Sequence, residues 1–305
     1  MLLPLSIVVC TRNRVDNLRR CIDTLFAVRT SQKWELVIID NGSEDGTADF
    51  LRLLTSPSVY PTLRTAFQTK RGLGAARNTG WRTASGEIIA FTDDDCYVAP
   101  DYVDAIVSVF SNKPDWGFAG GRILLYDPTD LAMAINPRDN PLQLRANTYV
   151  EVGVIQGANM AFRRKTLERI GGFDENLGAG TKFNCEDLDA AASALWTGIS
   201  GGYDPRPTVY HHHGRKSARE KRSTLIRYAQ GRGAYHAKFV LHRESRSLYL
   251  KTWKNRILLD LRGMLGTARR GRLPEFTDFM HEIYGGAKYF IWRSYHSLRA
   301  QREAP

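Results

Sequence analysis

Four short apolar runs, separated by helical segments, constrain the fold of this chain more than any other feature. Each run is long enough for one buried strand. The runs are Leu5–Cys10, Glu35–Ile39, Leu63–Phe67 and Glu87–Phe91. The expected helices between them are Arg14–Phe26, Thr47–Leu54 and Gly72–Thr83. Strands that alternate with helices favour a parallel sheet covered on both faces, so we expect an α/β fold.

Polar segments follow three of these strands, namely Thr11–Arg14, Asp40–Ser43 and Asp93–Asp95. In such sheets ligands bind beyond the carboxyl ends of the strands, so the three segments should share one edge. The first segment offers donors for phosphate or base contacts, and these are Thr11, Arg12 and Asn13. Asp40 is a lone acceptor that suits the imide N–H of uracil or thymine, although an Asx-turn or a helix cap is its commoner use.

Three adjacent carboxylates, those of Asp93, Asp94 and Asp95, are the most informative part of this edge. Side chains alternate along an extended backbone, so Asp93 and Asp95 can point the same way while Asp94 points elsewhere. Two hard oxygen ligands suit Mg²⁺ or Mn²⁺, which needs few protein carboxylates when phosphates supply the other ligands. A solvated acidic turn is the alternative, because loops are commonly acidic.

The second half of the chain carries another acidic pair and a run of histidines. Glu186 and Asp187 begin an amphipathic helix after a glycine-containing loop, where they could cap the helix or present a general base. A strand at Thr208–Tyr210 ends in three histidines, of which His211 and His213 are candidate metal ligands. A pH-sensitive surface is the alternative for these histidines.

The glycine-rich segment Arg71–Asn78 resembles a dinucleotide-binding loop but departs from it. The third glycine position of GxGxxG falls on Arg77, and the segment follows the third strand instead of the first. A helix start of this kind, followed by Arg77, still suits a nearby anion.

Charge divides the chain into two parts. The net charge is +11 over 305 residues. Residues 1–214 hold 22 basic and 25 acidic side chains, and residues 215–305 hold 21 and 7, which gives −3 and +14. So basic a tail suggests an anionic partner, either lipid headgroups or nucleic acid. The four cysteines are widely spaced with no CxxC pair, which favours reduced thiols and a cytoplasmic location.

Eight segments in this order resemble the family 2 glycosyltransferases, inverting enzymes that use nucleotide-sugar donors. They are Ser6–Arg14, Val37–Ser43, Gly72–Asn78, Phe91–Asp95, Gly157–Met160, Gly171–Asp174, Glu186–Asp189 and Val209–His211. The resemblance covers roughly residues 4–213. It implies a GT-A (Rossmann-like) α/β fold with a mixed, mostly parallel sheet flanked by helices. We expect a catalytic domain over 1–214, with a nucleotide-binding half near 1–98 and an acceptor half near 99–214, and a helical appendage over 215–305.

The resemblance also implies roles for individual residues. It places the nucleotide base against Thr11 and Asp40. Arg77, Asp93 and Asp94 are also expected to contact the donor. In Asp93–Asp95 it implies that the last acid binds a divalent metal, Mn²⁺ or Mg²⁺, and that the first aids the metal or the ribose. Asp187 would be the catalytic base, with Glu186 supporting it or the acceptor. His211 matches a histidine that meets the metal or the diphosphate in some members, with His213 as a substitute.

Chemistry agrees with these roles. Inverting transfer is a single displacement, in which one base takes the proton of the acceptor hydroxyl. The leaving nucleoside diphosphate gains charge that a metal can neutralise. The expected partners are a nucleotide-sugar donor, with UDP or dTDP favoured, and a glycan or lipid-linked acceptor. A sugar-phosphate nucleotidyltransferase is the nearest alternative, since it could also use strand-end acids with a metal.

The basic tail lies outside this resemblance and is expected to be mainly helical over 217–300. Apolar residues near one helical face are Phe276, Phe279, Met280, Ile283, Tyr284, Ala287, Phe290, Ile291 and Leu298. This face could pack on the catalytic body or dock on anionic lipid at the inner face of the membrane. A nucleic-acid-binding protein is the rival class, but no nucleic-acid-binding motif accompanies the charge, so we expect no nucleic-acid partner.

Overall fold

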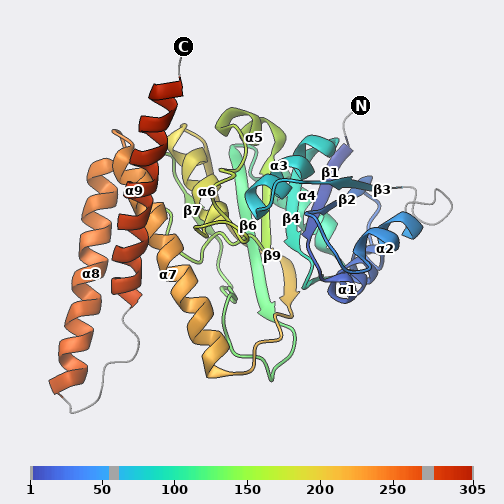
Figure 1. Cartoon of the computed structure of the whole chain (residues 1–305). Coiled ribbons are helices and arrows are strands. Elements are labelled where there is room, and N and C mark those ends of the chain that lie inside the picture. Colours follow the sequence, from blue (N-terminus) through green and yellow to red (C-terminus); the bar gives the residue numbers. More distant parts are fainter. Residues whose placement is uncertain (1–2, 55–61, 270–277, 304–305) are drawn as a thin grey trace. The chain divides into compact units, whose positions relative to one another are not determined.

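The computed structural model describes residues 3–54, 62–269 and 278–303. The chain divides into two compact units. The first unit is Met1–Lys182 with Glu186–Lys216, and the second unit is Phe183–Cys185 with Ser217–Pro305. Figure 1 labels the elements of both. The second unit resumes two residues after the division that the charge pattern suggested.

The first part of the first unit contains the strands and helices that the sequence predicts. Its elements are β1 (Leu3–Thr11), α1 (Val15–Phe26), β2 (Trp34–Asp40), α2 (Thr47–Leu54), β3 (Leu63–Phe67), α3 (Leu73–Thr83) and β4 (Gly86–Asp93). The four strands pair in parallel in the order β3-β2-β1-β4. β1, β2 and β4 are buried almost throughout because both of their faces are covered, as in other parallel sheets, whereas on the edge strand β3 only Leu63 is buried.

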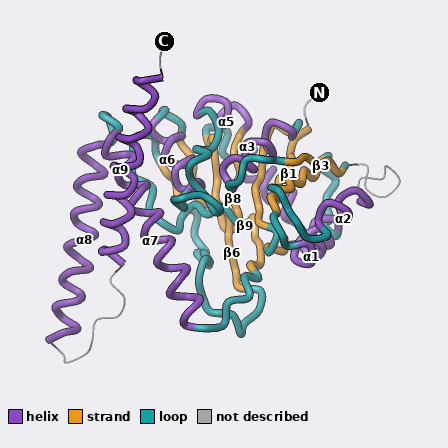
Figure 2. The backbone as a smooth tube through the Cα atoms, in the orientation of Figure 1, coloured by secondary structure: helices purple, strands orange, loops and turns teal. Residues whose placement is uncertain are grey.

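The rest of the first unit extends this sheet with mixed pairing. Its elements are β5 (Cys96–Val98), α4 (Tyr102–Asn112), β6 (Trp116–Leu125), β7 (Leu142–Leu144), β8 (Asn159–Arg163), α5 (Arg164–Ile170), α6 (Glu186–Trp196) and β9 (Ser200–His211). The order continues as β4-β8-β6-β9-β5, with β7 also on β9. β8 runs antiparallel to both β4 and β6, whereas β6 and β9 are parallel. Figure 2 shows the strands together with helices around them, and the expected mixed α/β sheet is confirmed.

The register of the strands brings the polar segments to one edge. Thr11 pairs with Asp40 across β1 and β2, and Cys10 pairs with Asp93 across β1 and β4. Apolar side chains of β1, such as Leu5, pack into a fully buried core beneath this edge. The core therefore fixes where the strands end, and that in turn fixes the positions of the acids.

Three long helices form the second unit, α7 (Ala218–Leu241), α8 (Arg246–Arg269) and α9 (Asp278–Glu303). Ser217 and Glu220 form a capping box that begins α7. Helices α7 and α9 approach closely at glycines, since an added Cβ at Gly285 would clash with the backbone of Gln230. No helix within the described ranges is long and apolar enough to cross a membrane.

The apolar face expected on the last helix is not the face that packs. The packed side of α9 presents Glu282, Gly285, Gly286 and Tyr289, all of which are buried. The expected apolar residues Met280, Ile283, Tyr284 and Ile291 are instead exposed. Phe276 lies outside the described residues, as does the Leu298 side chain. Small residues carry the contact because they let the two helix backbones come close.

Candidate active site at the strand ends

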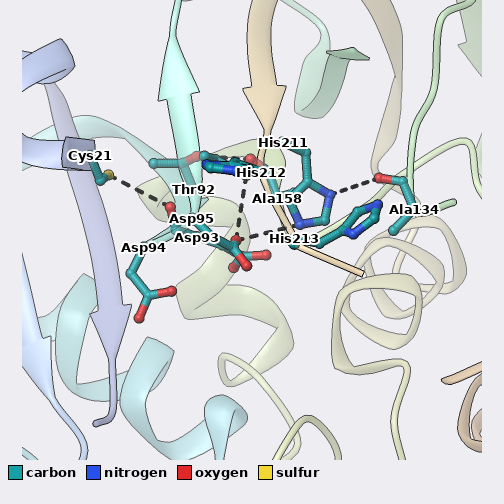
Figure 3. A network of polar contacts seen from close by, with 12 residues as sticks. Cys21, Thr92, Asp93, Asp94, Asp95, Ala134, Ala158, His211, His212 and His213 are labelled. Carbon is teal, nitrogen blue, oxygen red and sulfur yellow. Dashed lines mark hydrogen bonds and ion pairs between the residues drawn. The ribbon is translucent and has the colours of Figure 1, made fainter. Parts of the chain in front are cut away.

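The three strand-end acids differ in direction and burial. Figure 3 shows the Asp94 side chain pointing away from Asp93 and Asp95, although Asp94 and Asp95 lie in the turn after β4 and not on extended backbone. The Asp93 side chain is 32% exposed, whereas those of Asp94 and Asp95 are 4% and 6% exposed. Asp93, the last residue of β4, is therefore the one that solvent or a ligand reaches most easily.

Asp94 is bound by residues of the first strand end. Its Oδ2 accepts a hydrogen bond of 2.7 Å from the Thr11 hydroxyl, and its Oδ1 accepts one of 2.7 Å from Arg14 Nη1. The same nitrogen donates to Asp95 Oδ2 over 3.0 Å. Burial raises the pKa of Asp94 to about 6, although the Arg14 charge opposes this shift. Sequence reasoning assigned Thr11 and Asp94 to the donor, and here both are engaged in linking β1 to the acids.

Asp95 and His211 offer one pair of ligand atoms for a metal. Asp95 Oδ1 lies 3.4 Å from His211 Nε2, and His211 Nδ1 is held 3.1 Å from the carbonyl oxygen of Ala134. If Nδ1 carries the proton and donates to that carbonyl, Nε2 keeps its lone pair toward Asp95, which is how metal-binding histidines are oriented. Two neighbouring ligands of an octahedral ion at about 2.1 Å lie about 3 Å apart, so the spacing fits one cation. Without a cation, burial opposes ionisation of Asp95, but the hydrogen bond and the charge of a protonated His211, together with Arg14, outweigh it and lower the pKa of Asp95 to about 2. A bound cation would take the place of that proton on Nε2.

The Cys96 thiol also lies in this group, since one ligand atom from each of Asp95, Cys96 and His211 fall within 4.8 Å of one another. Burial raises the pKa of Cys96 well above its ordinary value, so it stays a neutral thiol. A neutral thiol is a poor ligand for Mg²⁺ or Mn²⁺. Asp93 is not part of this group.

The other two histidines are used within the fold. His213 Nε2 lies 3.0 Å from the carbonyl oxygen of Leu131, and its Nδ1 accepts a hydrogen bond of 3.0 Å from the Arg215 amide. His212 Nδ1 lies 3.0 Å from the Tyr97 hydroxyl. Because both ring nitrogens of His213 are occupied, the geometry favours His211 as the metal ligand of this run.

Arg77 connects the strand-end acids with the second acidic pair. Its Nη1 donates to Glu186 Oε1 over 2.5 Å, and its Nη2 donates to Asp93 Oδ1 over 3.3 Å. The Arg77 side chain is only 2% exposed. Burial raises the pKa of Glu186 to about 7, even though Arg77 opposes this shift. A buried guanidinium thus links acids that are ninety-three residues apart in the chain.

Asp187 is more open to solvent than Glu186 and is held by the backbone. Its Oδ2 accepts a hydrogen bond of 2.7 Å from the Gly157 amide, and its Oδ1 accepts one of 2.7 Å from the Leu188 amide. Gly157 also lies directly against the Arg77 guanidinium, because an added Cβ would be 2.9 Å from Arg77 Cζ. The absence of a side chain at Gly157 lets Arg77 and Asp187 come close to the same backbone segment.

A set of scaffold contacts behind Arg77 escaped the sequence reasoning. Asn78 Oδ1 accepts a hydrogen bond from the Phe173 amide, and Asn78 Nδ2 donates to the Phe173 carbonyl oxygen. The Phe173 ring lies 5.7 Å from Arg77 Cζ. Gly74 packs on the backbone of the following loop, since an added Cβ would be 2.6 Å from the Asp174 carbonyl oxygen. The glycine-rich segment therefore serves close packing. The sequence signal for these contacts was only that Gly72–Asn78 and Gly171–Asp174 both belong to the family pattern.

The remaining predicted donor residues lie at the ends of β1 and β2. Asp40 Oδ1 accepts a hydrogen bond of 2.8 Å from the Ser43 amide, three residues on, which is the reach of a capping interaction. Asp40 Oδ2 accepts no hydrogen bond from the residues that the structure describes. Asn13, at a φ of 53°, accepts from the Glu44 amide through its side chain, and Arg12 is half-buried beside it. This part of the edge keeps one acceptor unused.

The mixed sheet with acids at its strand ends defines a GT-A glycosyltransferase fold. The solved structures that share it include the following two. One is the mannosyltransferase PcManGT from Pyrobaculum calidifontis in complex with GDP-Man and Mn²⁺, with a TM-score of 0.61 and 20% identity over 95% of this chain and 88% of that one. The other is S. aureus TarS 1–349 in complex with UDP-GlcNAc, with a TM-score of 0.60 and 13% identity over 81% and 69%.

Sequence comparison identifies the family. The family model described as Glycosyl transferase family 2 matches residues 6–171, and the chain belongs to this family. Glycosyltransferase AglE of Haloferax volcanii is 26% identical over 178 residues, which are 57% of each protein. The glucosyl-dolichyl phosphate glucuronosyltransferase of the same organism is 24% identical over 187 residues, or 58% of each. The chain thus spans less than two thirds of the length of these relatives.

Proposed function

We propose that this protein is a metal-dependent, inverting glycosyltransferase. It would move a sugar from a nucleotide-sugar donor to a hydroxyl group of a glycan or lipid-linked acceptor, in the synthesis of cell-surface polysaccharide. The observation that carries the proposal is the Arg77 bridge, which brings the acid pair Glu186–Asp187 to the same edge as the metal-ligand pair of Asp95 and His211. Asp187 would then take the proton of the acceptor hydroxyl, while Asp95 and His211 would hold the metal at the leaving diphosphate.

Asp187 is the proposed base. Its two backbone hydrogen bonds fix the direction of the carboxylate, and each oxygen retains a lone pair for the proton of the acceptor hydroxyl. Glu186 is buried and bound to Arg77, so it supports the arrangement without meeting the acceptor. No second carboxylate is assigned as a nucleophile, which agrees with a single displacement and inversion.

Asp95 and His211 would hold the divalent cation, with Asp93 beside them. When bound, the cation would neutralise the charge that develops on the leaving diphosphate. A donor set with one imidazole and carboxylates favours Mn²⁺ over Mg²⁺, because Mg²⁺ prefers oxygen ligands alone. Two protein cations adjoin this group, since Arg14 meets Asp95 at 3.0 Å and Arg77 meets Asp93 at 3.3 Å.

Asp40 is proposed to accept the imide N–H of the base through Oδ2, while Oδ1 stays bound to the Ser43 amide. This favours a UDP- or dTDP-sugar, with Thr11, Arg12 and Asn13 on the same side of the edge. The solved structures of the fold hold GDP-Man in one case and UDP-GlcNAc in the other, so the fold alone does not select the base.

A lipid-linked acceptor is supported by the relative named for a glucosyl-dolichyl phosphate substrate. We propose that the protein is cytoplasmic and meets such an acceptor peripherally, at the inner face of the membrane. The excess of 21 basic over 7 acidic residues in 215–305 supports an anionic surface as a partner.

Nucleotide binding tests the proposal without knowledge of the acceptor. Thermal unfolding is followed with UDP, dTDP or GDP, each with and without Mn²⁺. We expect UDP or dTDP to raise the unfolding temperature only when Mn²⁺ is present, since a ligand at 100 times its Kd stabilises by about 2.7 kcal/mol. No shift with any nucleotide, or an equal shift without metal, would contradict the proposal.

Substitution of Asp187, the proposed catalytic base, tests the mechanism once the preferred nucleotide is known. Asp187→Asn should lower the transfer rate by about 100-fold or more and leave the nucleotide-dependent thermal shift unchanged. Asp101→Asn is the matched control, because Asp101 is exposed and makes no capping hydrogen bond. Full activity of Asp187→Asn would assign the proton transfer to another residue.

A further inference from the structure

Helix α8 has a packed side and an opposite side with a distinct composition. On the packed side, the Tyr249 hydroxyl lies 2.7 Å from the Tyr235 hydroxyl. The Trp253 ring stacks on His236 at 5.4 Å between centroids, and Arg256 Nε donates to Glu282 over 3.0 Å. These contacts fix which side of α8 faces its two neighbours.

The opposite side of α8 combines exposed leucines with exposed basic side chains. Leu250, Leu258 and Leu261 are 47%, 40% and 36% exposed. They follow one another at spacings of eight and three residues, with Lys254 midway along the same face. Lys251 and Arg262 are exposed alongside Leu258. We call the set Leu250, Lys251, Lys254, Leu258, Leu261 and Arg262 the outer face of α8.

The charge of this helix is turned outward. α8 holds six basic residues and one acidic residue over its length. Arg256 is neutralised by the buried Glu282, as is Arg232 of α7. The outer face itself contains no acidic side chain. An anionic partner would therefore meet three cations with little repulsion from the protein.

The exposed apolar stripe on α9 is different. Met280, Ile283, Tyr284, Ile291 and Tyr295 are between 44% and 72% exposed and lie on the side away from Glu282 and Tyr289. The basic residue of α9 next to this stripe is Lys288, whose Nζ lies over the Phe183 ring at 5.4 Å to the centroid and not among the five. Charge complementarity thus assigns lipid to α8, and leaves the α9 stripe as the competing surface.

We propose that the outer face of α8 docks on the surface of an anionic lipid bilayer. The helix would lie in the plane of the interface, with its leucines among the acyl chains and its lysines and Arg262 at the headgroups, as basic amphipathic helices do. Binding should weaken with salt, because it combines apolar burial with attraction to anionic lipid. This inference adds to the proposed function the surface that would meet the membrane. It rests on the proposed function only in assuming that the acceptor is lipid-linked.

Vesicle co-sedimentation of the full chain tests the docking without donor, metal or activity. The vesicles are phosphatidylcholine alone, or phosphatidylcholine with 30% phosphatidylglycerol. We expect binding to the anionic vesicles in 50 mM salt and at least tenfold weaker binding in 500 mM salt or without phosphatidylglycerol. If the chain binds anionic vesicles but no nucleotide, the proposed function is wrong and the docking stands. If it binds nucleotide but no vesicles, the docking is wrong and the proposed function stands.

Charge reversal locates the surface. The pair Lys251→Glu and Lys254→Glu should weaken binding to anionic vesicles at least tenfold, and Leu258→Ser should weaken it several-fold at either salt concentration. The pair Lys33→Glu and Lys165→Glu makes the same charge change at exposed sites of the first unit and should bind as the native chain does. Circular dichroism shows that each variant is folded.

Three outcomes would overturn the proposal. The first is equal weakening by the two charge-reversal pairs, which would make the attraction a property of net charge. The second is binding that survives the α8 substitutions but is lost in Tyr284→Ser with Ile291→Ser, which would assign the lipid contact to α9. The third is self-association of the native chain that these α9 substitutions abolish, without vesicle binding, which would assign the exposed apolar side chains to a second copy of the chain.

Discussion

Arg77 shows how much of the site depends on a single buried charge. Its guanidinium donates to both Glu186 and Asp93, with the Phe173 ring near its face. A buried charge is tolerated only when it is paired and hydrogen-bonded. Arg77 therefore needs Glu186, and Glu186 in turn needs Arg77. The pair should therefore be coupled in stability as well as in function.

Arg77→Gln should destabilise the protein by about 3–5 kcal/mol, because it leaves Glu186 buried without its partner. The double variant Arg77→Gln with Glu186→Gln removes both charges and should lose less than the sum of the single variants. Unfolding in urea gives the free energy of unfolding of the native chain, the two single variants and the double variant. Strict additivity would show that the two side chains do not interact in solution.

His211 and His213 give a second contrast at this scale, because they lie in one run of three histidines but use their ring nitrogens differently. His211→Ala should weaken Mn²⁺ binding about tenfold or more in the presence of the nucleotide, since one of few protein ligands is lost. His213→Ala should leave Mn²⁺ affinity within about twofold, as it breaks contacts to Leu131, Arg215 and Asp130 and an edge contact with the His211 ring but removes no proposed ligand. Titration of the electron paramagnetic resonance signal of free Mn²⁺ measures both. A larger effect of His213→Ala would make it the ligand.

At the scale of elements, the apolar runs were sufficient to predict β1 to β4 and the helices between them. Strand β6 was not predicted, because Gly117, Gly120 and Gly121 interrupt its apolar pattern. Close neighbours restrict these positions, as an added Cβ at Gly121 would lie 2.6 Å from the Pro207 carbonyl oxygen. Such a requirement comes from tertiary packing, which local pattern does not report.

Helix α7 allows a pH prediction away from the candidate metal site. Burial lowers the pKa of His236 to about 4, and the charges of Arg232 and Arg256 act in the same direction, while Nδ1 is held 2.8 Å from the Arg232 carbonyl oxygen. Glu282 faces the same ring at 3.5 Å but is bound by both arginines. The neutral imidazole is therefore the form that the folded state prefers.

Between the pKa of about 4 in the folded chain and about 6.5 in the unfolded chain, only the unfolded chain binds this proton. The His236 contribution to stability is complete above pH 6.5 and falls as the pH is lowered toward 4, by up to about 3 kcal/mol. His236→Phe keeps a ring beside Trp253 and should flatten this part of the pH dependence. Urea titrations from pH 4 to 7.5 compare the two proteins. Parallel curves would mean that His236 titrates equally in both states.

For the whole molecule, the sequence predicted the common edge of the acids, but not how the acids are held. The contacts of Arg14 with Asp94 and Asp95 join residues about eighty positions apart. They exist because β1 and β4 pair in a register that brings Cys10 opposite Asp93. The type of residue indicated an acid cluster, whereas the counter-ion of each acid depends on the assembled sheet.

The net charge of +14 over residues 215–305 predicts weak binding of nucleic acid without sequence preference. Any polyanion should bind weakly at low salt, because release of counterions from the phosphates drives such binding without regard to sequence. We expect equal affinity for unrelated 20-base-pair duplexes and a loss of about tenfold or more between 50 and 200 mM salt. Fluorescence anisotropy measures both, and Lys251→Glu with Lys254→Glu should weaken all duplexes alike. A preference for one duplex that persists at 200 mM salt would instead support the rival class, since contacts to base edges depend less on salt than contacts to phosphates do.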